Sequence, residues 1–586
     1  MTTPREPRKP ALVRRERKRA AKPSRIVAYD LETSPIKAGS PRPLYLTAWS
    51  PFVQVAESIG SFSDLHAIIT GQLLTPELSG AKFAAWNGNR FDAYFIAAAM
   101  VRDDRYRIIP LMTKSRELRG LDIVSLEDEG KRWSFTCGMA MLGIDCTLSE
   151  LLDSFAPDLP KLPAPDWSQG FDAARQDHRD YAMRDSEGLW HALDRAQRIV
   201  MQEFGEPLGL TMGGTGIRVF SASIPDRIVI KPAEEEAEQV IRQFLNRGGF
   251  VFCRGKYDGP VWKYDINQAH AAAMRECSMP CGSMLWDRFG PEDTTGAYMV
   301  KLSAIKPDNV VPWYVKMQDA QGRIRATYAR TVIRDAWVTS DEHRQLIAEG
   351  WEIEESEHWA WARTFTMRDF VDRLEAMRAQ APGGPQGPTG RMVKAIGTNC
   401  YGKTAEQPDG IEYCLARECP DGFLPWYEDD DGDPIEHVFW RPQEVAPKPH
   451  QKPQIAAFIT AHVRMVLRRA ALLDPSAWLY ADTDCLMFSR DMSHCLDIDA
   501  TRYGAWKIES AGEHHRIIMP KVYQSARKTA ARGMNVQTLT GEHFDKWFKG
   551  EAPNQTQVQL RNFLDVMRGA EMYRAINRRG SAITEE

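Results

Sequence analysis

The sequence of 586 residues predicts a protein of several domains that combines α/β and α+β units. At about 150 residues per domain, a chain of this length holds roughly four structural units. Between residues 26 and 205, strand-like runs such as IVAYDLET and KFAAWN alternate with helical runs such as FDAYFIAAAM. This alternation is typical of an α/β domain built around a mixed sheet.

Composition excludes several classes of protein. Hydrophobic residues make up 43% of the chain and charged residues 26%, which is ordinary for a globular protein and excludes collagen-like, coiled-coil and wholly disordered chains. No apolar run approaches the length of about 18 residues that a membrane span needs, so we expect no membrane partner. The ten cysteines include no CxxC pair, which favours reduced thiols in a cytosol-like compartment over a disulfide framework or a zinc site.

The net charge of −4 hides a basic N-terminus, since residues 1–25 hold ten Lys and Arg against two Glu. This segment has little apolar content, so we expect a disordered tail. A DNA contact driven by counterion release is one role for it. A solvated or targeting extension is the alternative.

The rest of the chain divides by composition into further elements. Strands feeding a helix are expected at 250–275, after a Gly-rich break at 209–220. The following expectations run in chain order: a β-rich stretch at 276–365, a helical hairpin at 366–403, an inserted loop or small β element at 404–453, a long helix at 453–473, a strand at 478–488 and an amphipathic helix at 559–579.

A first set of carboxylates falls in the N-terminal α/β domain. Asp30 and Glu32 stand two apart on a strand, so their side chains share a face. Asp92 begins a helix, and Tyr181 and Asp185 stand four apart on another helix. Four acids in one domain repel each other unless Mg²⁺ or Mn²⁺ neutralises them. Two such ions can activate water for phosphodiester hydrolysis, with Tyr181 orienting the water.

A second set lies in the later part of the chain. Asp265 stands where a strand meets a helix, and Asp482 and Asp484 stand at a hairpin tip. The helix between them carries two cations, a hydroxyl and an aromatic ring along one stripe: Arg391, Lys394, Thr398 and Tyr401. Such a stripe suits a triphosphate, and an ordinary solvated helix face is the alternative.

Taken in order, these motifs resemble those of the family B DNA polymerases, most closely the protein-primed branch of phages and linear plasmids. DLE, NGNRFD and YAMRD resemble the three motifs of an RNase H-like 3′→5′ proofreading exonuclease. TLSELLDSF, with Thr147 and Leu148, resembles a motif that binds single-stranded DNA, and Lys161 resembles a catalytic lysine. The resemblance implies that Asn87 and Phe91 bind the frayed 3′ end.

DINQAHA, KAIGTNCYGK and YADTDC resemble polymerase motifs A, B and C. Three shorter motifs imply further contacts with DNA: RGGF in the linker (Arg247, Gly248, Gly249), FITAHVR at the template (Thr460, Arg464) and PKVY at the primer terminus (Lys521, Tyr523).

The resemblance also implies two Mg²⁺ or Mn²⁺ ions in each of two catalytic sites, with deoxynucleoside triphosphates as substrates. The implied metal ligands are Asp265, Asp482, Asp484 and Ile266 for synthesis, and Asp30, Glu32, Asp92 and Asp185 for editing, where Lys161 and Tyr181 assist. The implied nucleotide contacts are Arg378, Arg391, Lys394, Tyr401, His270 and Ile266.

The implied architecture is an exonuclease domain followed by a right-hand polymerase of palm, fingers and thumb with two insertions. The expected segments are the basic tail at 1–25, the exonuclease at 26–205, the first part of the palm at 206–275, an insertion resembling terminal-protein region 1 at 276–365, the fingers at 366–403, an insertion resembling terminal-protein region 2 at 404–453, the second part of the palm at 454–520, and a primer-contacting segment and thumb at 521–586.

Three departures from the family pattern occur at the expected nucleotide and linker motifs. Residues 268–271 read QAHA where the family has SLYP, so His270 takes the place of the tyrosine that acts as a steric gate against ribonucleotides. Thr398 and Asn399 replace Asn-Ser in motif B, and Asn246 replaces the linker tyrosine. No metal ligand is lost, but discrimination between sugars is open.

The resulting expectation is a monomeric DNA-directed DNA polymerase that replicates a phage or mobile-element genome with strand displacement and proofreading. Its partners would be template and primer DNA and a terminal priming protein, in the bacterial host cytoplasm or, for a linear plasmid, in an organelle. DNA- or RNA-primed synthesis and primer-independent synthesis remain open. A nuclease-only enzyme and a non-catalytic replication protein are less favoured, because both carboxylate sets are complete.

Overall fold

The computed structural model describes the chain except residues 1–20, 36–38, 114, 129, 169, 288–294, 408–409, 428–433, 444–447, 568–569 and 580–586. Most of the predicted basic tail therefore lies outside the described residues. The backbone N–H of Ser24 donates to Oε1 of Gln197 at 2.9 Å, and the first strand begins two residues later.

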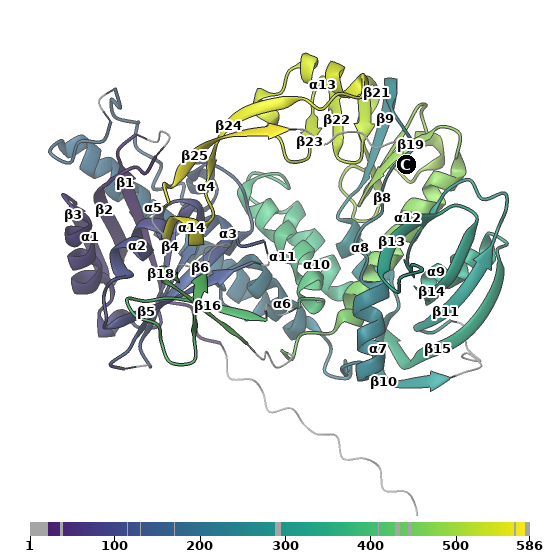
Figure 1. Ribbon diagram of the computed structural model, residues 1–586, viewed down its shortest axis with the longest axis horizontal. Helices are drawn as coiled ribbons and strands as arrows, with labels where there is room; N and C mark the ends of the chain where they lie inside the picture. Colours follow the sequence, from purple (N-terminus) through teal and green to yellow (C-terminus); the bar gives the residue numbers. More distant parts are fainter. Residues whose placement is uncertain are drawn as a thin grey trace, which may run out of the picture.

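The N-terminal part of the chain forms a mixed sheet covered by helices on both faces (Figure 1). Its strands are β1 (Ile26–Thr33), β2 (Pro43–Ser50), β3 (Val53–Ser58), β4 (Lys82–Ala85), β5 (Tyr106–Met112), β6 (Leu118–Ser125) and β7 (Arg132–Cys137). Its helices are α1 (Phe62–Ile68), α2 (Asp92–Met100), α3 (Gly138–Leu142), α4 (Leu148–Phe155) and α5 (Gln176–Phe204).

Strand β1 is buried on both faces, since Ala28 packs in the core on the α5 side and Val27 and Tyr29 pack in the core with α2. It pairs in parallel with β4 and antiparallel with β2, which confirms the predicted mixed α/β sheet.

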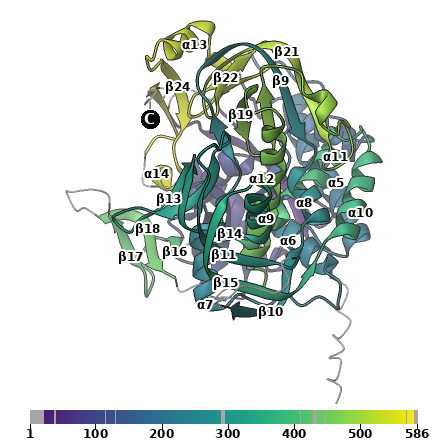
Figure 2. The same cartoon turned by 90° about the vertical axis from the view of Figure 1, so that its right-hand side faces the viewer.

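Residues 404–453 form a small β element, as expected, but this element extends the N-terminal sheet. Its strands are β16 (Ile411–Leu415), β17 (Leu424–Tyr427) and β18 (Pro434–Pro442). Leu415 of β16 pairs with Ile108 of β5, so ten strands run in the order β17-β18-β16-β5-β6-β7-β4-β1-β2-β3. Figure 2 shows the three added strands projecting to one side.

A second sheet carries the later acids, with strands in the order β23-β22-β21-β9-β20-β19-β8. These strands are β8 (Val251–Cys253), β9 (Tyr257–Ile266), β19 (Trp478–Asp482), β20 (Cys485–Phe488), β21 (Trp506–Met519), β22 (Val522–Ser525) and β23 (Thr529–Ala531). The helices of this region are α6 (Met212–Ser223), α7 (Glu235–Val240), α8 (Ala269–Glu276) and α12 (Pro453–Leu473). The strands at 250–275 and 478–488 and the helix at 453–473 are thus confirmed.

The Gly-rich break predicted at 209–220 is wrong, because most of it lies in α6. The Thr211 side chain caps this helix by accepting from the Gly214 N–H. A Cβ at Gly216 would stand 3.1 Å from the Ile396 carbonyl oxygen, so the small residues let α6 approach its neighbour closely.

The β-rich stretch and the helical hairpin are both confirmed. Residues 276–365 contain a four-stranded sheet in the order β10-β15-β11-β14 and a separate hairpin of β12 and β13. The elements are β10 (Met279–Asp287), β11 (Tyr298–Ile305), β12 (Trp313–Gln318), β13 (Ile324–Ala329), β14 (Val332–Thr339), α9 (Ser340–Ala348) and β15 (Glu352–Phe365), followed by the hairpin helices α10 (Arg368–Ala379) and α11 (Pro388–Thr404).

The helix predicted at 559–579 is wrong. This part of the chain contains β24 (Asn554–Leu560), α14 (Phe563–Met567) and β25 (Tyr573–Arg579), preceded by α13 (Gly541–Phe548). Phe563 of α14 stacks edge-on against Tyr94 of α2 at 5.2 Å, and Tyr573 bridges to Gly39. Docking on the N-terminal domain therefore outweighs the helical periodicity. Figure 1 shows β24 and β25 running from the second sheet to the first.

All ten cysteines are free thiols, as predicted. Among the described helices, none is long and apolar enough to cross a membrane.

Candidate active sites

The first carboxylate set gathers at the end of β1. Asp30 and Glu32 lie on this strand, and Asp92 is the first residue of α2, where its Oδ1 accepts the Leu31 N–H at 3.1 Å. Asp185 approaches from the long helix α5, which packs against β1. Asp92 and Asp185 are only 2% and 8% exposed, so these charges sit where water screens them poorly.

Burial, and then crowding, of these acids raises their pKa values. Burial first, and then the charges of Glu32, Asp92 and Asp185, raise the pKa of Asp30 well above its ordinary value. Burial and Asp185 raise the pKa of Glu32 to about 7. Burial raises the pKa of Asp92 to about 7, although backbone hydrogen bonds lower it. Near neutral pH these carboxyls therefore hold protons in part, and a bound cation would favour their ionised forms.

One built-in cation lies beside this set. The Lys161 ammonium is 2.8 Å from Oδ2 of Asp185 and 4.8 Å from the centre of the Tyr181 ring. Despite burial, which lowers it, the bond to Asp185 raises the pKa of Lys161. The predicted trio of Lys161, Tyr181 and Asp185 is thus in contact.

The residues present fit divalent metal ions. Four carboxylates supply the hard oxygen donors that Mg²⁺ and Mn²⁺ prefer. Oδ1 of Asp185 is buried and has no hydrogen-bond partner, so this oxygen is available as a ligand.

The residues predicted to bind the 3′ end differ in accessibility. Asn87 is exposed and has a positive φ of 67°, and Phe91 is half-buried directly before Asp92. Thr147 is exposed, but its hydroxyl caps α4 in a capping box with Glu150. Leu148 is 9% exposed and belongs to the core.

The second carboxylate set is assembled by backbone pairing. The Ile266 N–H donates to the Asp484 carbonyl at 2.8 Å, and Asp265 pairs directly opposite Cys485. The turn between Asp482 and Asp484 has a positive φ of 62° at Thr483. These contacts place the strand–helix junction of β9 beside the hairpin tip of β19 and β20.

The RGGF segment supports this hairpin tip. A Cβ added at Gly249 would stand 2.9 Å from Cα of Thr483, so this position admits only glycine without a shift. The Phe250 carbonyl accepts the Thr483 N–H at 2.8 Å. Gly248 has a positive φ of 73°.

Cations surround the second set, and one of them was missed by sequence reasoning. Lys507 of β21 lies 2.9 Å from Oδ1 of Asp265, and Lys521 lies 2.8 Å from Oδ1 of Asp482. Burial first, and then the charge of Asp265, raise the pKa of Asp484 to about 6, although Lys394 and Lys507 lower it. No spacing in the sequence linked Lys507 to an acid more than two hundred residues before it.

These acids also fit divalent ions, since they supply oxygen donors in a half-buried cluster in which Asp265 and Asp484 have raised pKa values. Asp265 follows the same trend as Asp484, because burial raises its pKa although Lys507 lowers it. The Ile266 side chain is 3% exposed and is a hydrocarbon, so only its backbone carbonyl could serve as a ligand.

Two aromatic rings predicted to flank the nucleotide are stacked. The rings of His270 on α8 and Tyr401 on α11 are 4.6 Å apart with planes 8° from parallel. Burial, and then the Arg464 cation, lower the pKa of His270 to about 4, so its imidazole is neutral at physiological pH. Lys394 is exposed, and desolvation with Arg378 and Lys507 lowers its pKa. Arg378 itself is 8% exposed.

Arg391 is turned away from this cluster. Its Nη1 donates to the Asp145 carbonyl at 2.8 Å, in the N-terminal domain. The side chains of the predicted stripe on α11 therefore do not all face one site, because Arg391 contacts the N-terminal domain whereas Tyr401 stacks on His270.

Arg247 and Arg464, predicted as DNA contacts, are buried around one carboxylate. Arg464 Nη2 lies 2.9 Å from Oε1 of Glu342, and Arg247 also pairs with Glu342, whose side chain is 0% exposed. Arg464 further donates to the Gly248 carbonyl at 2.7 Å. This cluster joins α12, the RGGF segment and α9.

Two other predicted DNA contacts are also buried. Thr460 is 8% exposed and its hydroxyl donates to the Ala456 carbonyl at 2.9 Å. Tyr523 is 6% exposed, and its ring contacts that of Tyr480 edge-on at 5.9 Å.

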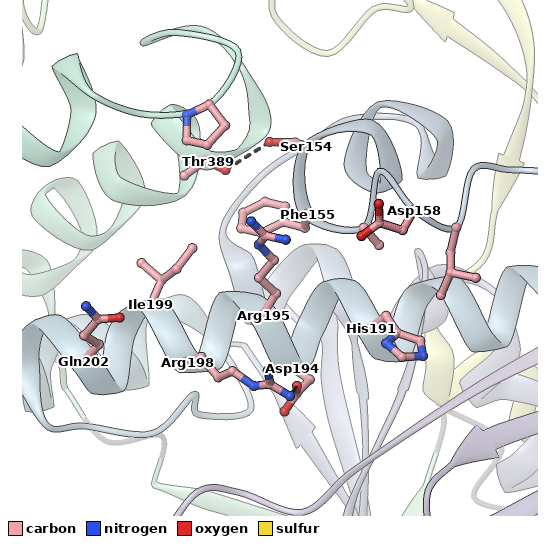
Figure 3. A pocket seen from close by; sticks show the side chains of 13 residues that line it. Ser154, Phe155, Asp158, His191, Asp194, Arg195, Arg198, Ile199, Gln202 and Thr389 are labelled. Atoms are coloured by element: carbon pink, nitrogen blue, oxygen red, sulfur yellow. Dashed lines mark hydrogen bonds and ion pairs between the residues drawn. The ribbon is translucent and has the colours of Figure 1, made fainter.

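A cavity of about 540 Å³ lies apart from both carboxylate sets, between α4 and α5 on one side and the start of α11 on the other (Figure 3). The Ser154 and Thr389 hydroxyls are 2.9 Å apart at its edge, and Phe155 and Ile199 line it. The two domains therefore touch beside an open space.

The sequence is similar to those of known DNA polymerases. Residues 176–419 match the family described as DNA polymerase type B, organellar and viral. A DNA-directed DNA polymerase of Enterobacteria phage PRD1 is 25% identical over 361 residues, which cover 60% of this chain and 60% of that protein.

Solved structures of Phi29 DNA polymerase share the fold. The ternary complex with primer-template DNA and incoming nucleotide has a TM-score of 0.72 at 15% identity, covering 96% of this chain and 100% of that one. The post-translocation binary complex has a TM-score of 0.69 at 14% identity, covering 95% and 100%. The chain thus has the exonuclease, palm, fingers and thumb arrangement that the resemblance implied. Residues 176–419 are thus similar to type B DNA polymerases, organellar and viral, and the chain as a whole shares its fold with Phi29 DNA polymerase.

Proposed function

We propose that the protein is a template-directed DNA polymerase with a 3′→5′ exonuclease in the same chain. The observation that carries this proposal is the presence of two separate carboxylate sets on two separate sheets, each beside its own lysine. The Phi29 structures with this fold hold primer-template DNA and incoming nucleotides, which supports the same substrates here.

In the synthetic site, Asp265 and Asp484 would hold two Mg²⁺ ions, with Asp482 an outer ligand. In the editing site, Asp30, Glu32, Asp92 and Asp185 would hold two more. When bound, the ions would activate the attacking oxygen and stabilise the leaving oxygen in both reactions.

The chain's own groups would then position the substrates. Lys394 and Arg378 would neutralise the triphosphate, and the stacked rings of His270 and Tyr401 would flank the sugar and base. Lys521, beside Asp482, would place the primer end. Catalysis would rest on positioning and charge stabilisation.

In the editing site, Lys161 would hold Asp185 ionised, and Tyr181 would orient the attacking water. Asn87 and Phe91 would bind the frayed 3′ end through hydrogen bonding and stacking. Removal of a mismatched nucleotide would precede further synthesis.

We further propose protein-primed initiation and strand displacement on a phage or mobile-element genome in a bacterial host cytoplasm. The fold shared with the phage enzyme and the two β-rich insertions at 276–365 and 404–453 support this mode. Primer-independent synthesis is the second candidate, and the observation that favours it is the histidine at position 270, which leaves more room at the sugar than a tyrosine.

The test compares wild type, Asp484→Ala and the double variant Asp30→Ala with Glu32→Ala on single-stranded DNA, with and without an annealed primer. Labelled deoxynucleotides and Mg²⁺ are supplied, and products are sized. We expect wild type to extend the primer, Asp484→Ala to degrade without extending, and the double variant to extend without degrading. A primed template that Asp484→Ala still extends would refute the synthetic site. Products without primer in wild type would establish self-started synthesis.

A further inference from the structure

A group of sulfur, nitrogen and oxygen donors lies at a junction of three elements, outside both carboxylate sites. Cys277 directly follows α8, Asp341 lies in the first turn of α9, and His462 lies in α12. A potential ligand atom from each of the three lies within 4.8 Å of one from each of the others. These residues come from segments 64 to 185 positions apart, so no spacing motif could have indicated the group.

We infer that Cys277, Asp341 and His462 form a structural Zn²⁺ site. A thiolate, an imidazole and a carboxylate are donors that Zn²⁺ takes in proteins, with ligand distances of about 2.0–2.3 Å. The three ligand atoms, which lie within 4.8 Å of one another, would close around the ion, and water would be the fourth ligand. The softness of the thiolate favours Zn²⁺ over the Mg²⁺ that the carboxylate sites prefer.

The surroundings of the imidazole fit this role. Nδ1 of His462 is 2.9 Å from Oδ2 of Asp341, which places that nitrogen on the side of the proposed ion. The opposite nitrogen, Nε2, lies 3.7 Å from a carboxylate oxygen of Glu276. A metal-bound histidine characteristically donates its other N–H to a carboxylate, which orients the ring.

The remaining ligands are also placed for binding. Arg344 pairs with Oδ1 of Asp341 at 2.6 Å, and Oδ2 accepts from Nδ1 of His462 at 2.9 Å, so the ion would take the place of the proton between these two atoms. Cys277 is 2% exposed, whereas the side chains of Asp341 and His462 are 22% and 16% exposed, so an ion can enter from their side. On binding, the thiol proton of Cys277 and the Nδ1 proton of His462 leave to solvent.

An ion at this site would hold three segments of the chain together. The ion would tie the end of α8, which follows Asp265 along the chain, to α9 of the 276–365 insertion and to α12. An ion at this site can be distinguished from the proposed catalytic ions, because its sulfur ligand gives a spectroscopic signature that sites with only oxygen ligands lack.

The test uses Co²⁺ as the probe on the purified full chain, after removal of metals with EDTA. We expect a thiolate-to-Co²⁺ charge-transfer band that saturates at one equivalent in wild type and in the control Cys281→Ser, whose cysteine is equally buried and lies outside the group. Cys277→Ser should lose the band, and Glu276→Gln should keep it with affinity about 10–100-fold weaker. A band of full height in Cys277→Ser, or none in folded wild type, would overturn the inference.

A second measurement avoids the variants, in case Cys277→Ser does not fold. Wild type is alkylated with and without one equivalent of Zn²⁺, and modification of each cysteine is followed by mass spectrometry. Zn²⁺ should slow alkylation of Cys277 at least about tenfold while leaving Cys419 and Cys495, which are exposed, unchanged. Equal rates at Cys277 under both conditions would show that the group is only an ion-paired cluster.

Discussion

The Lys507 ammonium lies 2.9 Å from Oδ1 of Asp265, a carboxylate that we propose binds Mg²⁺. Lys507 also pairs with Glu509 at 3.3 Å, so the lysine is shared between a site residue and its own strand. A cation in this place competes with a metal ion for Asp265 while it keeps the carboxylate ionised.

Lys507→Ala should therefore lower the Mg²⁺ concentration that gives half-maximal synthesis, because the competing charge is gone. Lys507→Arg, which keeps the charge, is the matched control and should resemble wild type. Primer extension across a Mg²⁺ series measures both variants. A rise in the Mg²⁺ requirement of Lys507→Ala would contradict this account.

His270→Tyr should tighten selection against ribonucleotides. The tyrosine ring extends further than the imidazole that stacks on Tyr401, so it would crowd a 2′-hydroxyl. We expect the ratio of ribo- to deoxynucleotide incorporation to fall at least about tenfold, which corresponds to about 1.4 kcal/mol of discrimination. An unchanged ratio, with synthesis intact, would show that another residue contacts the sugar.

Lys161→Met should move the acid limb of the exonuclease pH profile to higher pH. Lys161 lowers the pKa of Asp30, Glu32 and Asp185, so its removal lets these acids hold their protons to higher pH. Degradation of single-stranded DNA by wild type, Lys161→Met and the exposed control Lys549→Met is measured from pH 5 to 9. A shift to lower pH, or an equal shift in synthesis, would refute the assignment.

The metal-free protein should lose stability as pH rises from about 4.5 to about 7. The pKa of Glu32 rises from 4.5 in the unfolded chain to about 7 in the fold, so across this window the unfolded state releases a proton that the folded state keeps. Asp92 acts in the same direction. Thermal unfolding in EDTA measures this loss of stability. Added Mg²⁺ should reduce the loss of stability above pH 7. The double variant Asp30→Asn with Glu32→Gln should show a weaker dependence of stability on pH.

Glu342→Gln should destabilise the fold by about 3–5 kcal/mol, because it leaves the buried Arg247 and Arg464 without a counter-charge. Urea unfolding measures the loss. Glu354→Gln, at an exposed position on β15, should stay within about 0.5 kcal/mol of wild type. Equal stabilities of the two variants would show that the buried cluster contributes little.

Local patterns predicted the parts of the structure whose causes are local. The alternation around Asp30 and Glu32 and the four-residue step from Tyr181 to Asp185 indicated a strand and a helix, and both are present. The segment around Phe563 shows the limit of such patterns. Its apolar spacing predicted one long helix, but Phe563 packs against Tyr94 of the N-terminal domain and the segment forms two strands and a short helix.

The contacts that could not be predicted are ion pairs between residues that lie far apart in the sequence. Arg247 and Arg464 were expected to face DNA because they lie in segments that resemble DNA-contacting motifs. Both instead surround Glu342, which lies 95 and 122 residues away. The cation Lys507 was missed for the same reason, since only the pairing of β21 with β9 brings it to Asp265.

The pairing of β16 with β5 has a consequence for the order of events on the ribosome. Strand β5 stays an open edge until β16 is made, about 300 residues later, which takes about 15–60 s at synthesis rates of about 5–20 residues per second. An unpaired edge is a template for aggregation, so the nascent chain is exposed to misassociation during that interval. Chains released before Ile411 would keep this edge permanently and should accumulate as insoluble fragments.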